Sequence, residues 1–295
     1  MLVVDLGQSG SRIRYLEATT HTMRGKLNGE SVLDSFKAIF SELPLISVDQ
    51  VALSCTGFNG VVSEPEKYFK LCQEFFGAKE VAVMDDGLAG FVGALNGRNG
   101  VVLSVGGGVV SVGGREGKYA HRDGLGSTFG DEGGGFWLGK NAITKALGIR
   151  QGRGDDKDML NYFADECAAY DHLTVKNTAE AATLAIRTAK KVLDAADAGI
   201  STATAIVDEG AYLLAQTVVA TWYGCGGAKS DSPEIVIQGG PARNSTYATK
   251  IALEVNAKLP NAVNVQSSGD NLDGATWIAN NMRQDAPPLL LWAGL

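Results

Sequence analysis

Two hydrophobic periods follow one another along the first hundred residues. Short apolar runs bounded by glycine or polar residues predict strands at 2–4, 13–16, 51–55 and 81–84, with a further candidate at 22–27. Apolar residues that recur every three or four positions predict helices at 31–40, 66–76 and about 87–95. Strands that come first and then alternate with helices favour a mixed α/β sheet layered with helices.

The rest of the chain opens with a similar cycle and then becomes rich in helix. Strands are predicted at 100–105, 109–112, 118–121, 234–238 and 262–266. Helices are predicted at 132–147, where Gly148 would be the C-terminal cap, and at 156–170, 178–197, 201–222, 242–257 and 273–282. The tail 284–295 contains prolines and is expected to be irregular or packed on the surface. Two halves that each open with strand, glycine turn and strand suggest a duplicated fold.

Composition narrows the class of protein. A length of 295 residues corresponds to about two domains, and 45% apolar with 20% charged residues is ordinary for a soluble globular enzyme. The net charge of −7, without any run rich in Lys or Arg, gives no electrostatic footprint for nucleic acid or an anionic membrane. Any phosphate binding must therefore be local.

Cysteine spacing and hydropathy favour a cytoplasmic protein. The four cysteines show no CxxC spacing, so neither a zinc site nor a disulfide framework is indicated, and reduced thiols are expected. No apolar run approaches the roughly 20 residues needed to cross a bilayer. The first residues also lack the basic start and long apolar stretch of a signal peptide.

The first candidate motif is Asp5-x-Gly7-x-Ser9-Gly10-Ser11, an acid at the end of a strand followed by a tight turn with hydroxyls. Backbone N–H groups of such a turn suit phosphate oxygens, and the acid suits a metal held through water. A plain hairpin turn with an exposed acid explains the same residues equally well.

The second motif is the acid pair Asp85-Asp86 directly after a predicted buried strand. The carboxyl ends of strands are where α/β proteins open their ligand crevices, so one of the two acids is a candidate base. The alternative is a helix N-cap for 87–95, a role that Asp often fills. The two roles are compatible.

The third motif is the glycine-dense run 124–139, in which Asp131 occupies an expected helix N-cap. Asp131 and Glu132 would be stabilised by the helix dipole without any ligand. Glycines on both sides of the acids, however, weaken a first helical turn and indicate that something approaches the backbone closely.

A further glycine pair, Gly239-Gly240, links a predicted strand to a helix start and would suit an adenine or ribose lying over the backbone, although such connections are common. Other chemistries lack support. The chain has no complete Walker loop, no G-x-G-x-x-G and no nucleophile elbow, and His21, His121 and His172 share no motif.

In this order, the glycine loops and acids resemble the actin-like ATPase fold of sugar kinases, and most closely the N-acetylglucosamine kinase family grouped with BadF/BadG/BcrA/BcrD-type ATPases. The most specific element is Gly130-Asp131-Glu132-Gly133-x-x-x-Trp137-Leu138-Gly139. The resemblance implies a two-domain (ribonuclease H-like) fold with duplicated mixed sheets and a cleft that closes over ATP and sugar, often in a homodimer. We place the domains at 1–99 and 100–295, with the last helix or tail allowed to pack back on the first domain.

The resemblance also implies roles for individual residues. Asp86 matches the catalytic base for the sugar 6-hydroxyl, and Asp5 matches the position that serves Mg²⁺. The sugar-contacting positions are Asn28, Asp86, Gly124 and Asp131. The ATP-contacting positions are Gly7, Gln8, Ser9, Gly10, Ser11, Gly106, Gly107, Gly108, Gly239, Gly240 and Ala242. Phosphoryl transfer asks a protein chiefly for this kind of positioning and charge neutralisation.

Two departures from the family pattern bear on the substrate. Gly107 and Val109 stand where relatives usually offer a threonine and a serine, and Leu125 stands where many place a tryptophan against the acetamido group. We therefore expect a kinase for an amino sugar, with N-acetylglucosamine first and glucosamine, N-acetylmuramate or another hexose as alternatives. Two other classes stay open, namely an ATPase that activates a radical dehydratase or reductase, and a sugar sensor without catalysis. No cysteine lies between Cys72 and Cys167, which disfavours the iron–sulfur activator.

Overall fold

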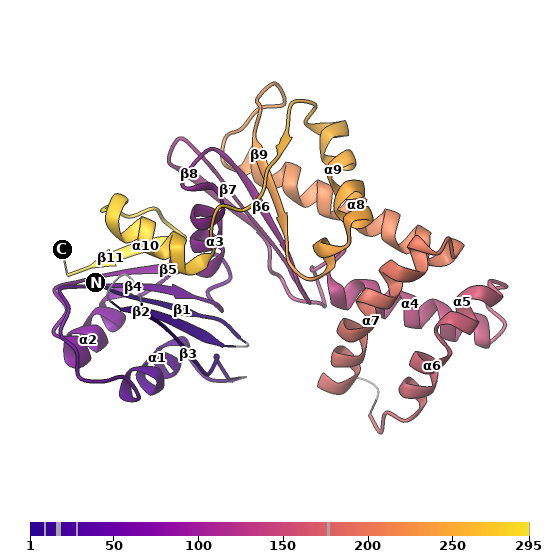
Figure 1. Cartoon of the computed structure of the whole chain (residues 1–295), viewed down its shortest axis with the longest axis horizontal. Helices are drawn as coiled ribbons and strands as arrows, with labels where there is room; N and C mark the ends of the chain where they lie inside the picture. Colours follow the sequence, from indigo (N-terminus) through magenta and orange to yellow (C-terminus); the bar gives the residue numbers. More distant parts are fainter. Residues whose placement is uncertain (9, 16–18, 28, 176–177, 295) are drawn as a thin grey trace.

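Two mixed β-sheets form the frame of the molecule (Figure 1). The computed structural model describes residues 1–8, 10–15, 19–27, 29–175 and 178–294. The first sheet has the order β11-β5-β4-β1-β2-β3, with β1 Leu2–Leu6, β2 Ser11–Tyr15, β3 Thr19–Met23, β4 Gln50–Cys55, β5 Glu80–Asp85 and β11 Leu290–Ala293. The second has the order β10-β9-β6-β7-β8, with β6 Gly100–Val105, β7 Val109–Arg115, β8 Lys118–Asp123, β9 Glu234–Gln238 and β10 Val263–Asn264.

The two sheets repeat one topology. In each, the first three strands form an antiparallel meander, β1-β2-β3 and β6-β7-β8. The next two strands of each half then add in parallel on the other side of the first, as β4 and β5 do in one sheet and β9 and β10 in the other. This repetition confirms the duplicated α/β fold predicted from the two strand-turn-strand openings.

Helices cover the outer face of each sheet. We call the first sheet with α1 (Val32–Ser41) and α2 (Pro65–Phe76) the small lobe. The large lobe is the second sheet with α4 Gly135–Arg150, α5 Lys157–Tyr162, α6 Ala164–Asp171, α7 Ala179–Asp197, α8 Ser201–Gly224 and α9 Ser245–Lys258. Between the lobes lie α3 (Asp86–Leu95) and α10 (Asn271–Asn281), as Figure 1 shows.

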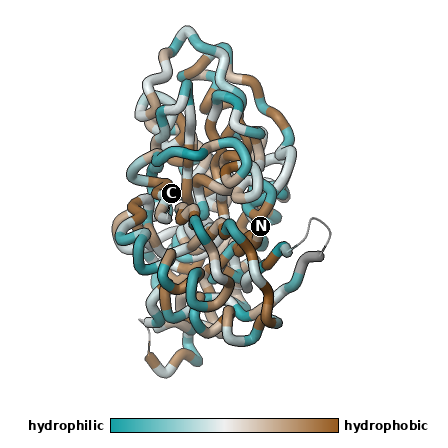
Figure 2. The backbone as a smooth tube through the Cα atoms, turned by 90° about the vertical axis from the view of Figure 1, so that its left-hand side faces the viewer, coloured by the Kyte–Doolittle hydropathy of each residue, from teal (hydrophilic) through white to brown (hydrophobic). Residues whose placement is uncertain are grey.

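Side-chain alternation along β1 explains this layering. Leu2, Val4 and Leu6 pack with α1 and α2, whereas Val3 faces the opposite side and joins the core around α3 and α10. That inner core also takes Val102 and Val236 from the second sheet. Because both faces of the central strands are covered, their sequences read as continuous apolar runs. Figure 2 shows brown, hydrophobic stretches through the middle of the fold as well as at its edge.

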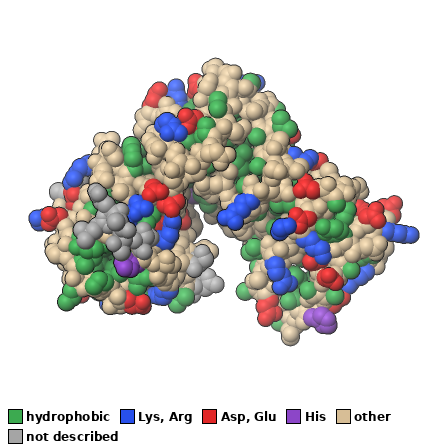
Figure 3. Space-filling view, viewed as in Figure 1, with side chains coloured by type: hydrophobic (Ala, Val, Ile, Leu, Met, Phe, Trp, Pro, Cys, Tyr) green, Lys and Arg blue, Asp and Glu red, His purple; other side chains and the backbone are tan. Residues whose placement is uncertain are grey.

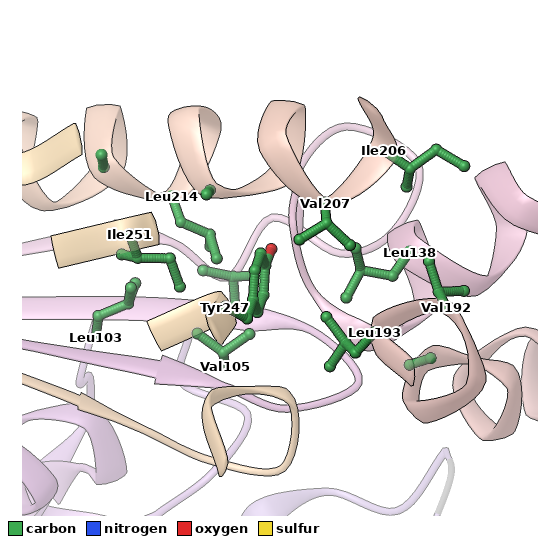
Figure 4. Packing of buried hydrophobic residues seen from close by; sticks show 14 of the residues in the cluster. Leu103, Val105, Leu138, Val192, Leu193, Ile206, Val207, Leu214, Tyr247 and Ile251 are labelled. Atoms are coloured by element: carbon green, nitrogen blue, oxygen red, sulfur yellow. The ribbon is translucent and has the colours of Figure 1, made fainter. Parts of the chain in front are cut away.

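The core of the large lobe is centred on Tyr247 of α9 (Figure 4). Its ring is fully buried, and its hydroxyl donates a hydrogen bond of 2.8 Å to the carbonyl oxygen of Gly133. A buried phenol needs such a partner, so the bond fixes the loop before α4 to the core. Among the described residues, no helix combines the length and apolar character needed to cross a bilayer.

Several predicted helix boundaries were wrong. Helix α4 begins at Gly135 with Gly134 as N-cap, and it continues through Gly148 to Arg150. Gly148 is not the cap because the left-handed glycine that follows the helix is Gly152, with φ 80°. The segment predicted as one helix at 156–170 is broken at Phe163 into α5 and α6.

The predictions for the helix at 242–257 and for the tail, both close to prolines, differ from the structure. Pro241–Arg243 form a short 3₁₀ turn, and α9 starts afresh at Ser245 with Asn244 as its N-cap. The tail is irregular up to Leu289, but β11 then pairs antiparallel with β5 and becomes the edge of the first sheet, so the tail packs back on the first half of the chain. Strand β3 lies at Thr19–Met23 rather than 22–27, and β10 is shorter than predicted.

Helices α3 and α10 cross at backbone contact distance. A Cβ atom built on Gly93 would lie 1.9 Å from the carbonyl oxygen of Asp270, and one built on Gly274 would lie 1.8 Å from the carbonyl oxygen of Ala89. No side chain fits at either position, so the two helices pack directly against each other. This contact sets the separation of the two sheets on either side.

We therefore expect Gly93→Ala to lower the free energy of unfolding by about 1–3 kcal/mol, because the methyl group forces the helices apart. Urea unfolding measures this. Gly148→Ala is the matched control, since its Cβ would meet only atoms of Arg153 at 3.8 Å and a helix interior favours alanine. Equal stability of Gly93→Ala and wild type would contradict the close packing.

Candidate active site

Two cavities open beside the loop Gly106–Gly108 that joins β6 to β7. The first, which we call the acidic cavity, measures about 460 Å³ and is lined by Asp85, Asp86, Asp131 and His121 among others. The second, the basic cavity, measures about 640 Å³ and carries Arg187, Lys190 and Arg243. Gly106 lines both cavities, so the loop lies at their junction. Figure 3 shows the deep notch between the lobes.

The acid pair at the end of β5 divides its roles. Asp85 is the N-cap of α3 and accepts hydrogen bonds from the amides of Gly87 (2.9 Å) and Gly60 (3.0 Å). Asp86 is the first residue of the helix and lines the acidic cavity. Because Asp85 takes the capping role, the carboxyl group of Asp86 is left for chemistry in the cavity.

Burial, together with the neighbouring charges of Asp85 and Asp5, raises the pKa of Asp86 to about 7. A hydrogen bond from Thr56, which also lines the cavity, opposes the rise. A carboxyl group with a pKa near the working pH is suited to accept a proton during a reaction and release it afterwards. Asp86 therefore has the electrostatics of a general base.

Asp131 joins the glycine-dense run to the Gly106–Gly108 loop between β6 and β7. Its carboxylate accepts a hydrogen bond of 2.8 Å from the amide of Val109 and packs against Gly108. Its own amide donates to Asp123 at 2.9 Å. The residue is 9% exposed, and burial raises its pKa. Asp131 is thus held rigidly at the wall of the acidic cavity, but it is not the helix N-cap that the sequence suggested.

The glycines after Asp131 serve the protein's own packing. A Cβ atom on Gly133 would lie 2.6 Å from Leu214 of α8, and the amides of Gly135 and Phe136 donate to the carbonyl oxygens of Gly106 and Gly107 at 2.8 and 2.9 Å. The close approach predicted from these glycines is therefore made by neighbouring backbone and by α8. The first amides of α4 are used in this contact, which fixes the Gly106–Gly108 loop.

The basic cavity lies between the Gly106–Gly108 loop, α7 and the turn at Gly240–Asn244. Its cations are partly compensated, since Lys190 pairs with Asp194. Ile186 of α7 explains the glycine at 107, because a Cβ there would lie 3.1 Å from the Ile186 side chain. Val109, the second position of the same departure, is buried and borders the acidic cavity. Neither position supplies a hydroxyl group to the cavity.

Asp5 lies near the end of β1, just before the turn to β2, and is 7% exposed. Its carboxylate accepts hydrogen bonds from Ser54 and Arg12, both at 2.8 Å, and is close to Asn271 of α10. The described residues include no cluster of three or more His, Cys, Asp or Glu side chains arranged for a metal ion. A single carboxylate fits Mg²⁺ only when the ion keeps waters and shares phosphate oxygens, which is how Mg²⁺ commonly binds with nucleotides.

The predicted site residues fall into four groups according to whether and where they line the two cavities. Gln8, Asp86, Gly106, Gly108, Gly124 and Asp131 line the acidic cavity. Gly106, Gly107 and Gly240 line the basic cavity. Asp5, Gly7, Gly10, Ser11, Gly239 and Ala242 line neither, and Ser11 is fully buried, with its hydroxyl donating to the carbonyl oxygen of Arg24. Ser9 and Asn28 lie outside the described residues.

Sequence reasoning missed several lining residues. Thr56, Asn59 and His121 of the acidic cavity, and Arg187, Lys190 and Arg243 of the basic cavity, belong to no local motif. The only available signal was the position of Thr56 and Asn59 just after a predicted strand end. The cations come from α7 and from the turn before α9, and only the tertiary fold brings these segments to the Gly106–Gly108 loop.

Several solved structures with a similar fold are described as sugar kinases, and one is described as a ROK family transcriptional regulator. A candidate N-acetylglucosamine kinase from Porphyromonas gingivalis aligns with a TM-score of 0.64 at 14% identity, covering 95% of this chain and 99% of that one. A candidate N-acetylglucosamine kinase from Chromobacterium violaceum gives 0.59 at 20% identity, covering 93% and 97%. A ROK family glucokinase from Streptomyces griseus, in complex with glucose and AMPPNP, gives 0.57 at 14%, covering 95% and 99%. The fold is therefore the actin-like ATPase fold of these kinases.

The family follows from the sequence as a whole. The model of the BadF/BadG/BcrA/BcrD ATPase family matches residues 2–279, and the chain belongs to this family. No curated protein sequence matches the chain significantly.

The raised pKa of Asp86 predicts a pH-dependent stability. Because its folded pKa of about 7 lies above the value of about 4 in an unfolded chain, the wild type should lose stability as pH rises from about 4 to about 7. Asp86→Asn removes this loss, so the variant should gain relative to wild type over that interval, by at most about 4 kcal/mol.

Denaturant unfolding at a series of pH values measures the difference between the two proteins. Asp158→Asn, an exposed position, accounts for the loss of one negative charge as such. A constant difference between Asp86→Asn and wild type from pH 4 to pH 7 would contradict the buried environment of Asp86.

Proposed function

We propose that the protein is an ATP-dependent kinase that transfers the γ-phosphoryl group of ATP to the 6-hydroxyl of an amino sugar, with N-acetylglucosamine as the leading substrate. The observation that carries the proposal is the pair of cavities that meet at Gly106, one holding Asp86 and the other holding cations. An anionic nucleotide suits the basic cavity and a polyhydroxylated acceptor suits the acidic one. The phosphoryl group would then cross at the glycine loop.

In this mechanism each residue has a physical task. Asp86 accepts the proton of the attacking hydroxyl. Asp131 and the backbone of Gly124 hold the sugar so that this hydroxyl faces the Gly106–Gly108 loop. Arg187 and Arg243 favour the nucleotide by charge. Bound Mg²⁺ would neutralise charge on the phosphates, and Asp5 with its neighbouring loop is the place for it.

The identity of the sugar depends on a few contacts at the mouth of the acidic cavity. Leu125 is 68% exposed between Gly124 and Gly126, which both line the cavity. An apolar side chain there can contact the methyl of an acetamido group but cannot stack as a tryptophan does. Glucosamine, N-acetylmuramate and another hexose therefore remain alternatives.

Two other functions compete with the kinase. An activator of a radical dehydratase or reductase would hold an iron–sulfur cluster through cysteines, yet Cys55, Cys72, Cys167 and Cys225 are buried and line neither cavity. A sugar sensor without catalysis agrees with the missing hydroxyls at Gly107 and Val109, but it leaves the electrostatics of Asp86 without a use. A cytoplasmic location and a homodimer remain predictions.

The decisive experiment measures ADP release from Mg-ATP with N-acetylglucosamine, glucosamine, N-acetylmuramate, N-acetylmannosamine, glucose and no sugar. Release that depends on one amino sugar is the expected result. Asp86→Asn should then lower turnover by at least ~10²-fold while ATP binding stays largely intact, because only the base is lost. Release without sugar favours the activator, and tight sugar binding without turnover favours the sensor.

The basic cavity supplies a separate prediction. Arg187→Ala should raise the KM for ATP by roughly 3–10-fold, the range for losing one partly screened charge contact, and should leave the KM for sugar unchanged. Lys37→Ala, an exposed cation on the far side of the small lobe in α1, is the control. An unchanged KM for ATP in Arg187→Ala would argue that the nucleotide binds elsewhere.

A further inference from the structure

The carboxylate of Asp85 has one side that no backbone amide occupies. Its two oxygens accept hydrogen bonds from Gly60 and Gly87, and the residue is 1% exposed. On the remaining side lies the imidazole of His121, whose Nε2 is 3.8 Å from Oδ1. A charged group this deeply buried generally requires full satisfaction, so the approach of His121 is significant.

This approach joins the two lobes. Asp85 and Gly60 belong to the small lobe, whereas His121 is on β8 of the large lobe. The ring lies against Gly60, where a Cβ atom would come within 2.9 Å of its Cγ, and against Gly124 of the sugar-contacting loop, where a Cβ would come within 3.2 Å of its Cε1. His121 thus contacts both walls of the acidic cavity beside Asp86.

The ring is mostly buried and is not committed to another partner. Its side chain is 11% exposed, and within the described part of the chain it makes no hydrogen bond. Since β7 presents only Val110 and Val112 to this side, the charges near the ring are Asp85 from β5 and Arg122 and Asp123 on its own strand. Burial lowers its pKa, so the neutral ring with one N–H donor is expected at neutral pH.

We propose that His121 is a positioning residue for phosphoryl transfer. It approaches Asp85 across the boundary between the lobes and in this way fixes the position of Asp86 relative to the loop that contains Gly124. The inference rests on the proposed kinase function. A distance of 3.8 Å is too long for a hydrogen bond, and an approach of the lobes by less than about 1 Å would let Nε2–H donate to Asp85. Closure over the sugar would then lock the base in place.

The test compares steady-state kinetics of His121→Phe, which keeps the ring volume without a donor, with His121→Gln, whose amide nitrogen can take the place of Nε2. We expect His121→Phe to lower kcat by ~10–100-fold, the range for a slightly misplaced reacting group, with a change in sugar KM below about 3-fold. His121→Gln should recover most of kcat. His172→Gln, an exposed histidine, is the control and should match wild type.

A double variant shows whether the effect passes through Asp85. Adding His121→Phe to Asp85→Asn should lower kcat no further than Asp85→Asn alone, because the partner is already gone. If His121→Phe does not fold, the comparison of His121→Gln with the shorter His121→Asn decides, and equal kcat for these two would overturn the proposal.

The remaining outcomes separate the two levels of inference. Wild-type kcat in folded His121→Phe, or full additivity in the double variant, overturns the role of His121 and leaves the kinase function standing. Absence of sugar-dependent ADP release from the wild type overturns the kinase function and, with it, the role of His121 in phosphoryl transfer.

Discussion

The contact between α3 and α10 is the constraint on which the rest of the structure depends. The helices meet backbone to backbone at Gly93 and Gly274, and the inner faces of both sheets pack around them. Asp86 is the first residue of α3, and Asn271 at the start of α10 lies beside Asp5. The one contact therefore places both ends of the candidate site. Any change in helix separation would move the base and the proposed metal position together.

Charge is arranged on this frame so that each cavity has its own character. Asp86 sits among other acids in a poorly hydrated place, which raises its pKa to about 7. The cations of the basic cavity come from α7 and the turn before α9 and face the other side of the Gly106–Gly108 loop. An acidic protein can in this way favour an anionic nucleotide locally while its net charge of −7 works against nonspecific anion binding.

The glycines that follow Asp131 serve the packing of the protein itself. They let the loop before α4 contact α8 and donate hydrogen bonds to the carbonyl groups of Gly106 and Gly107. Asp131 adds a side-chain bond to Val109 in the same region. The Gly106–Gly108 loop is therefore held by its neighbours, and in the proposed function a loop fixed in this way would lose less entropy on binding a nucleotide.

The sequence by itself determined the strand and helix order and the duplication, and it singled out Asp86 and Asp131 as candidate site residues, because hydrophobic period and glycine placement are local signals. The tertiary structure alone decided that Asp85 rather than Asp86 is the cap, that β11 completes the first sheet, and that His121 and Arg187 reach the cavities. These outcomes depend on which segments distant in the chain pack together. A glycine, an acid or a histidine carries the same local pattern whether its neighbour is a ligand, an amide or another lobe.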